Sequence, residues 1–121
     1  YTDRQQQHYQ AIAEPAARKI LLDISSWKAA DMRKHLSHEA RQTISPEQLD
    51  ALLSQYRPLG KLRSVNELFF SKLMSVFSLL GDARVSYAGT ATFENGPASL
   101  TLTLVEQDNT FLIYNFNLTA D

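Results

Sequence analysis

The spacing of apolar residues changes once along the chain. In the first half they recur every three or four positions, which predicts amphipathic helices, and from Arg84 onward they alternate with polar residues, which predicts strands. Pro15 fits the first turn of a helix but not its interior, so the first packed helix is expected to begin near Glu14. Its buried stripe consists of Ala17, Ile20, Leu21 and Ile24.

Two further helices are predicted before residue 60. One runs from Trp27 to about Ala40, with Ser25 or Ser26 as its N-cap. The other begins at Ser45-Pro46-Glu47-Gln48, where a hydroxyl stands at the N-cap, proline at the first helical position and glutamine at the third. Its inner stripe is Leu49, Leu52, Leu53 and Tyr56, and Pro58 with Gly60 ends it.

Three runs with period two follow, at residues 84–94, 98–106 and 110–119. Asn95-Gly96 is the favoured pair for a two-residue type I′ turn, which predicts that Phe93 pairs with Ala98. For the second hairpin we expect a three-residue loop at 107–109, because a two-residue loop would place Leu102 opposite Asn115.

This register gives the sheet one apolar face, which the helices must cover. It carries Val85, Tyr87, Gly89, Ala91, Phe93, Leu100, Leu102, Leu104, Leu112, Tyr114, Phe116 and Leu118. The other face mixes threonines and asparagines with a few apolar residues, a composition intermediate between a core and a solvated surface. Such a face is typical of a homodimer interface, with Thr101, Thr103, Val105, Phe111 and Ile113 as its candidate residues.

Composition and charge narrow the class of protein. A chain of 121 residues with 44% hydrophobic and 21% charged residues is expected to fold as one globular domain at 14–121, preceded by an extension or linker at 1–13. The net charge is −1 and the basic residues are scattered, which argues against a nucleic-acid partner. No stretch is apolar enough to span a membrane. There is no cysteine. The start at Tyr1, without an initiator methionine, is expected either of a trimmed chain or of a mature form from which a targeting segment has been removed.

Several residues connect the chain to a known group of proteins. They are Asp23 and Trp27 in DISSW, the segment RPLGKL at 57–62, Tyr87, Phe93 and the closing FLIYNFNL. With three helices before an antiparallel sheet, the chain resembles small bacterial secreted or lipid-anchored proteins of unknown function with the nuclear transport factor 2-like (cystatin-like) fold. The resemblance implies an α+β cone in which three N-terminal helices pack on a curved antiparallel sheet of about four strands, and a periplasmic or secreted location.

The resemblance also bears on residues 66–80. Their apolar residues follow helical spacing, whereas the resemblance implies that residues 61–72 form the first strand of the sheet and 73–82 a connection. We expect the strand.

One group of residues has the chemistry of a metal site. Asp31, His35 and His38 share a helix side at spacings of four and three, with Glu39 beside them, so they are candidate ligands for zinc. That side is polar, however, and histidine is also favoured near a helix C-terminus, so a solvated helix face is the more common outcome. We therefore expect no metal and no other cofactor.

A pocket between helices and sheet is the other candidate site. Gly89 and Ala91 are small and are expected opposite leucines, which leaves either a filled core or an apolar hollow bounded by Trp27, Tyr87, Tyr114 and Phe116. The inner face offers no carboxylate or histidine as a general base. The sequence therefore favours a non-catalytic binding domain of the bacterial cell envelope, with an unknown protein or a small apolar molecule as its partner. A small-molecule-binding protein or an enzyme of the ketosteroid isomerase-like kind is the alternative.

Overall fold

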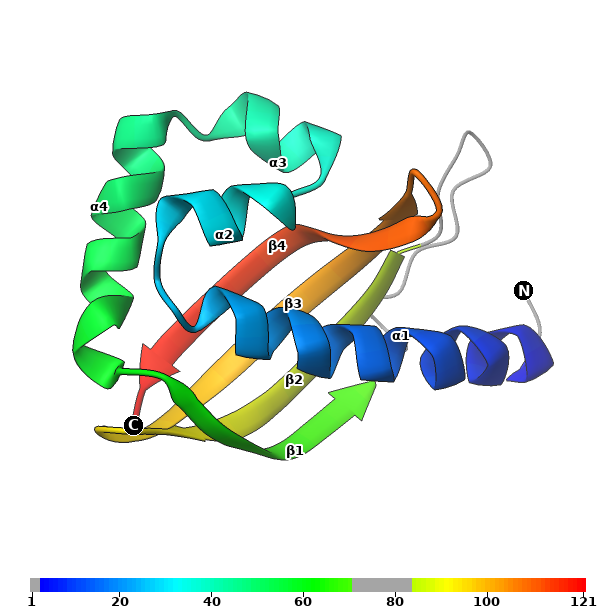
Figure 1. The fold of residues 1–121 in the computed structure, drawn as a ribbon. Coiled ribbons are helices and arrows are strands. Elements are labelled where there is room, and N and C mark those ends of the chain that lie inside the picture. Colours follow the sequence, from blue (N-terminus) through cyan, green and yellow to red (C-terminus); the bar gives the residue numbers. More distant parts are fainter. Residues whose placement is uncertain (1–2, 71–83) are drawn as a thin grey trace.

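The computed structural model describes residues 3–70 and 84–121, which form an α+β fold (Figure 1). Within these residues four α-helices precede a four-stranded antiparallel sheet with the strand order β1-β2-β3-β4. The elements are α1 (Asp3–Ile24), α2 (Ala29–Lys34), α3 (His38–Thr43), α4 (Pro46–Tyr56), a 3-10 turn (Arg57–Leu59), β1 (Leu62–Phe70), β2 (Arg84–Phe93), β3 (Gly96–Gln107) and β4 (Thr110–Ala120). The predicted α+β class is confirmed.

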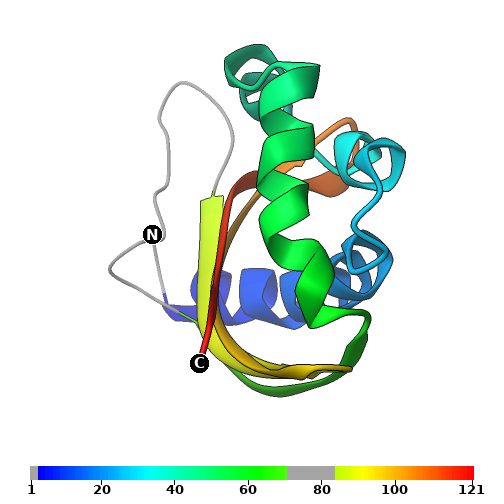
Figure 2. The same ribbon diagram turned by 90° about the vertical axis from the view of Figure 1, so that its left-hand side faces the viewer.

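The helices lie together on one side of the sheet, which curves around them without closing (Figure 2). Between the two layers lies the hydrophobic core, to which the sheet contributes Val85, Tyr87, Ala91, Phe93, Ala98, Leu100, Leu102, Leu104, Ile113 and Leu118. The predicted burial of Leu100, Leu102 and Leu104 beneath the helices is thus confirmed.

Helix α1 is longer than its apolar stripe predicts. It runs from Asp3 to Ile24 with Pro15 in its interior, so it starts eleven residues before the expected Glu14. Residues 3–13 are therefore helical and continuous with the packed part of α1. None of the helices in the described ranges combines the length and apolar content that a bilayer span requires.

The helix predicted from Trp27 to Ala40 is wrong, because two short helices, α2 and α3, take its place. Between them, residues 35–37 form a parallel bridge to the edge of β4. The Ile113 N–H donates to His35 O at 2.6 Å, and the Ser37 N–H donates to Ile113 O at 2.8 Å. Pairing with a distant strand has replaced helical hydrogen bonds at this point, which short-range spacing does not reveal.

Helix α4 and strand β1 agree with the sequence. The Ser45 hydroxyl accepts from the Gln48 N–H at 3.1 Å, and the Gln48 side chain accepts from the Ser45 N–H at 2.9 Å, so the predicted cap is confirmed. Strand β1 covers Leu62–Phe70, as the resemblance implies, and helical spacing over residues 66–70 was misleading. Residues 71–83 lie outside the described part of the chain.

The β2–β3 turn lies one residue earlier than predicted, which shifts the pairing of the two strands by two residues. Phe93 pairs with Gly96 instead of Ala98, so Glu94 and Asn95 form the turn. The segment before β1 fixes this choice: the Lys61 N–H donates to the Glu94 carboxylate at 2.7 Å, and the Asn95 N–H donates to Leu59 O at 3.0 Å. Because a shift of two preserves the alternation, the residues of β2 and β3 face as predicted.

The β3–β4 hairpin has a two-residue loop, Asp108-Asn109, and the predicted three-residue loop is wrong. Both loop residues have positive φ, 55° and 62°, as a type I′ turn requires. A bulge at Tyr114 restores the apolar pairing farther along, so that Leu102 faces Phe116 and not Asn115. The two-residue loop sets Ile113 opposite Leu104, on the side that faces the helices.

Candidate functional site

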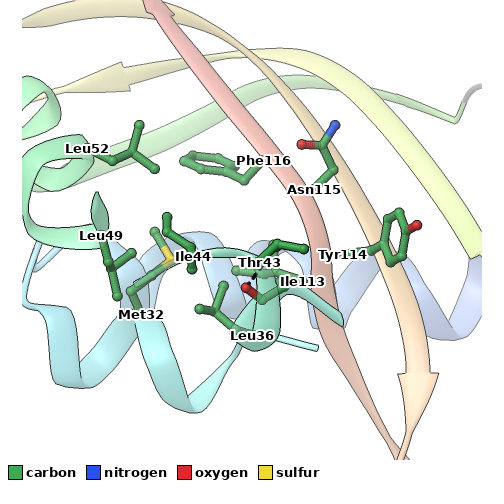
Figure 3. Close-up of a pocket in the computed structure, with 11 residues that line it drawn as sticks. Met32, Leu36, Thr43, Ile44, Leu49, Leu52, Ile113, Tyr114, Asn115 and Phe116 are labelled. Atoms are coloured by element: carbon green, nitrogen blue, oxygen red, sulfur yellow. Dashed lines mark hydrogen bonds between the residues drawn. The ribbon is translucent and has the colours of Figure 1, made fainter. Parts of the chain in front are cut away.

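A cleft of about 190 Å³ opens where α2, α3 and α4 meet the edge strand β4 (Figure 3). Most of its lining is aliphatic or aromatic, and its polar residues carry no carboxylate or imidazole. The lining consists of Met32, Leu36, Ala40, Thr43, Ile44, Leu49, Leu52, Ile113, Tyr114, Asn115 and Phe116. Cavities with this mixture are typical of small-ligand sites.

The helical wall follows from the apolar stripes. Met32 and Leu49 are 2% exposed, and Leu52 and Ile44 are half-buried beside them. The proline and the capping box at Ser45 set the start of α4. Figure 1 shows α4 at an angle to α2, and the cleft lies where these helices meet β4.

The strand wall depends on the bulge in β4. It places Ile113 and Phe116 on the helix-facing side, with Tyr114 and Asn115 between them. The ring of Phe116 meets Tyr56 of α4 edge-on, with centroids 5.9 Å apart and an angle of 80°. This contact packs Phe116, a lining residue of the cleft, against α4.

A second cavity, of about 250 Å³, adjoins the first. The two share Ala40, Thr43, Tyr114 and Asn115, and the second adds Glu39 at the start of α3. The Gln107 amide donates to both oxygens of the Glu39 carboxylate, at 2.7 and 3.1 Å. This hydrogen bond is the main cause that holds the pKa of Glu39 below its usual value, so the carboxylate is ionised at neutral pH.

Arg84, at the start of β2, lies behind this site. Its guanidinium carbon is 4.1 Å from the centre of the Tyr114 ring, a cation–π contact. Its Nε is buried and has no hydrogen-bond partner among the residues that the structure describes. Arg84 lines neither cavity, although its charge contributes to the lowered pKa of Glu39.

Of the five residues predicted to bound a pocket, Tyr114 and Phe116 line the cleft. Trp27 and Tyr87 are buried in the core and do not reach it. Gly89 faces the backbone of β1, where a Cβ atom would collide with the carbonyl oxygen of Glu67. The small residue thus allows a close approach of two strands, and of the two alternatives for Gly89, a filled core or a hollow, the hollow is not among the cavities described above.

Trp27 joins the segments that carry the resemblance. Its backbone has φ of 54°, its indole N–H donates to Gly60 O at 2.8 Å, and its carbonyl accepts from Arg57 Nε at 3.2 Å. Its ring lies 5.4 Å from that of Tyr56 and 5.9 Å from that of Phe93. The residues of DISSW and RPLGKL are therefore positioned to hold the fold together.

The candidate metal ligands do not come together. Asp31 accepts from the Ser26 hydroxyl at 2.6 Å, His35 pairs with Asp23 at 3.1 Å, and His38 pairs with Asp108 at 3.0 Å. Across residues 3–70 and 84–121 no group of three ligand side chains could hold an ion.

The candidate interface residues are divided between the two faces of the sheet. Phe111 contacts the helix-facing core and Ile113 belongs to it, a consequence of the two-residue loop that precedes β4. Thr103 and Val105 lie on the other face and are buried, and Thr103 shares a hydrogen bond of 2.9 Å with Ser86. Thr101 is half-buried.

The helical wall of the cleft was missed by the sequence reasoning. Its residues belong to stripes that predict a filled core, and nothing in their spacing shows that a cleft remains between the helices and β4.

Comparisons with known proteins give no family for this chain. No protein-family model matches it, and neither the curated proteins nor the solved structures contain a match.

Proposed function

We propose that this protein is a non-catalytic binding domain whose cleft between α2, α3, α4 and β4 receives a small, largely apolar ligand. The main support for this proposal is the lining of the cleft: among the described residues that form it, only Thr43, Tyr114 and Asn115 are polar. A volume of about 190 Å³ suits one aromatic ring or a short aliphatic chain, since cavities of about 150 Å³ hold benzene.

An isomerase-like enzyme would need a general base inside the cleft. Among the described residues that line the two cavities, Glu39 carries the one carboxylate, and its lowered pKa makes it a poor proton acceptor near neutral pH. The chemistry of the site therefore supports binding over proton transfer.

The family and the location belong to the same proposal. Helices that precede a curved antiparallel sheet support the nuclear transport factor 2-like assignment, and the resemblance of DISSW and RPLGKL supports the cell envelope of a bacterium. Fractionation of bacteria that express the full-length gene product tests the location. A homodimer through the outer sheet face has less support, because Phe111 and Ile113 do not lie on that face.

Filling the cleft tests the binding function. Ala40 lines both cavities, so we expect Ala40→Leu to occupy the space where a ligand would sit. Hexan-1-ol should shift the backbone amide resonances of α3, α4 and β4 in the unmodified protein, and its affinity should fall about tenfold in the variant. Titration followed by two-dimensional NMR measures both effects.

Ala51→Leu is the matched control, because Ala51 is exposed on α4 and lies outside both cavities. It should leave the affinity for hexan-1-ol unchanged. Equal affinities for the unmodified protein and the Ala40→Leu variant would show that the cleft is not the binding site.

A further inference from the structure

The two adjoining cavities differ in chemistry. The cleft is apolar, whereas the second cavity is lined by Glu39, Thr43 and Asn115 together with Ala40 and Tyr114. Because four lining residues are shared, one ligand can place an apolar chain in the cleft and a polar head in the second cavity.

Two residues of the second cavity, Glu39 and Thr43, favour a head group that donates hydrogen bonds, whereas Tyr114 and Asn115 can either donate or accept. The Thr43 hydroxyl directs its proton to backbone carbonyls of α3, those of Glu39 and Ala40, both at 3.2 Å. Because this proton is already used, the Thr43 hydroxyl can only accept a hydrogen bond from a ligand. The Glu39 carboxylate is also an acceptor, and among the described residues that line the two cavities it is the only charged group.

Glu39 is held in place as well as charged. The side-chain amide of Gln107, at the end of β3, donates through its nitrogen to both carboxylate oxygens of Glu39, and its oxygen accepts from the His38 N–H at 3.0 Å. The carboxylate is thus oriented by a neutral amide, which leaves its negative charge available to a ligand.

We propose that the ligand is a small primary amine, whose apolar chain enters the cleft and whose ammonium group pairs with Glu39 and Thr43. An ammonium group has three donors and one positive charge, which match a carboxylate and an accepting hydroxyl. This inference rests on the proposed function of the cleft and adds the charge of the head group.

An anionic head group fits less well, although Arg84 is near. The guanidinium group of Arg84 is engaged with the Tyr114 ring and lines neither cavity. A carboxylate in the second cavity would lie beside Glu39, and like charges at short distance repel.

Three compounds with the same six-carbon chain test the head group: hexylammonium, hexan-1-ol and hexanoate. Isothermal titration calorimetry of the whole chain at pH 7 should give the tightest binding for hexylammonium, about fivefold tighter than hexan-1-ol, as expected for a partly exposed ion pair. Hexanoate should bind more weakly than hexan-1-ol.

Glu39→Gln removes the charge but keeps an oxygen that can accept from Gln107. In this variant hexylammonium and hexan-1-ol should bind equally, and the affinity for hexan-1-ol should stay the same. Glu47→Gln is the control, because Glu47 is exposed on α4 and lines neither cavity. It should retain the preference for the amine.

The outcomes separate the two proposals. If none of the three compounds binds, the cleft is not a ligand site and the proposed function fails. If all three bind equally, the cleft stands but the choice of an amine is wrong. Tighter binding of hexanoate, or a preference for the amine that persists in Glu39→Gln, also overturns the choice of an amine.

Discussion

At the scale of single residues, Gly89 has the most specific structural role. Strand β1 bulges between Val65 and Glu67, and this brings its backbone against β2 at Gly89. An added methyl group would meet the Glu67 carbonyl oxygen, which belongs to the backbone and cannot rotate away. The glycine is needed for contact between two main chains.

Gly89→Ala is therefore expected to destabilise the fold. The clash forces β1 away from β2, and overpacking of this kind costs about 1–3 kcal/mol. Urea denaturation measures the change in the free energy of unfolding. Ala88→Ser, at the exposed neighbouring position, should change it by less than about 0.5 kcal/mol. A Gly89→Ala variant as stable as the parent would show that β1 can shift without cost.

The role of Gly89 could not be predicted from the sequence. Small residues opposite leucines suggested a hollow, but the partner that mattered was β1, whose place in the sheet is not encoded near Gly89. Tyr114 and Phe116 were predicted as pocket residues because β4 alternates clearly. Their position in the cleft nevertheless depends on a bulge that only pairing with β3 reveals.

At the scale of elements, α3 is held to the sheet by polar contacts. None of its residues is buried, and its first turn is bonded to the β3–β4 hairpin through Gln107. The helix also carries Glu39, Ala40 and Thr43 to the rim of the site. The order of the site thus depends on this attachment.

Gln107→Ala should loosen α3 and leave the sheet intact. It removes the bonds to Glu39 and to the His38 N–H, and we expect faster hydrogen exchange at residues 38–43 with a loss of global stability of about 1 kcal/mol. Hydrogen–deuterium exchange with mass spectrometry gives the local rates. Glu106→Ala, at the exposed preceding position, should change neither quantity. Unchanged exchange in α3 would mean that other contacts hold the helix.

Helices and strands could be predicted where the residues that determine them lie close together in the sequence. Helix α4 has its cap within four residues, and the three strands after Arg84 follow the alternation of side chains. The break between α2 and α3 has its cause in β4, more than 70 residues away, where Ile113 pairs with His35 and Ser37. The β2–β3 turn likewise depends on the segment before β1.

At the scale of the whole molecule, burial of Tyr87 links stability to pH. Burial, with a smaller contribution from Glu14, raises the pKa of the Tyr87 hydroxyl to about 12, against 10.0 for an ordinary tyrosine. The neutral form is favoured in the folded state. The resulting stabilisation is complete below pH 10 and is lost as the pH rises toward 12, because the unfolded chain loses the proton first.

Tyr87→Phe should remove this dependence. Between pH 10 and pH 12 the stability of the variant should fall less than that of the parent, by about 1.4 kcal/mol for each unit of pKa difference. Urea denaturation of both proteins at pH 7, 10 and 12 provides the comparison. At pH 7, the reference, Tyr87 is neutral in both the folded and the unfolded parent. Parallel losses in both proteins would show that Tyr87 titrates normally in the fold.

The bridge between residues 35–37 and β4 affects whether a strand of another molecule can pair with the edge of the sheet. An outermost strand presents backbone groups to which any extended chain can add, and this is a route to aggregation. At Ile113 both backbone groups are already occupied by the protein's own chain. The break that divides one expected helix into two thus shields this point of the sheet from a foreign strand.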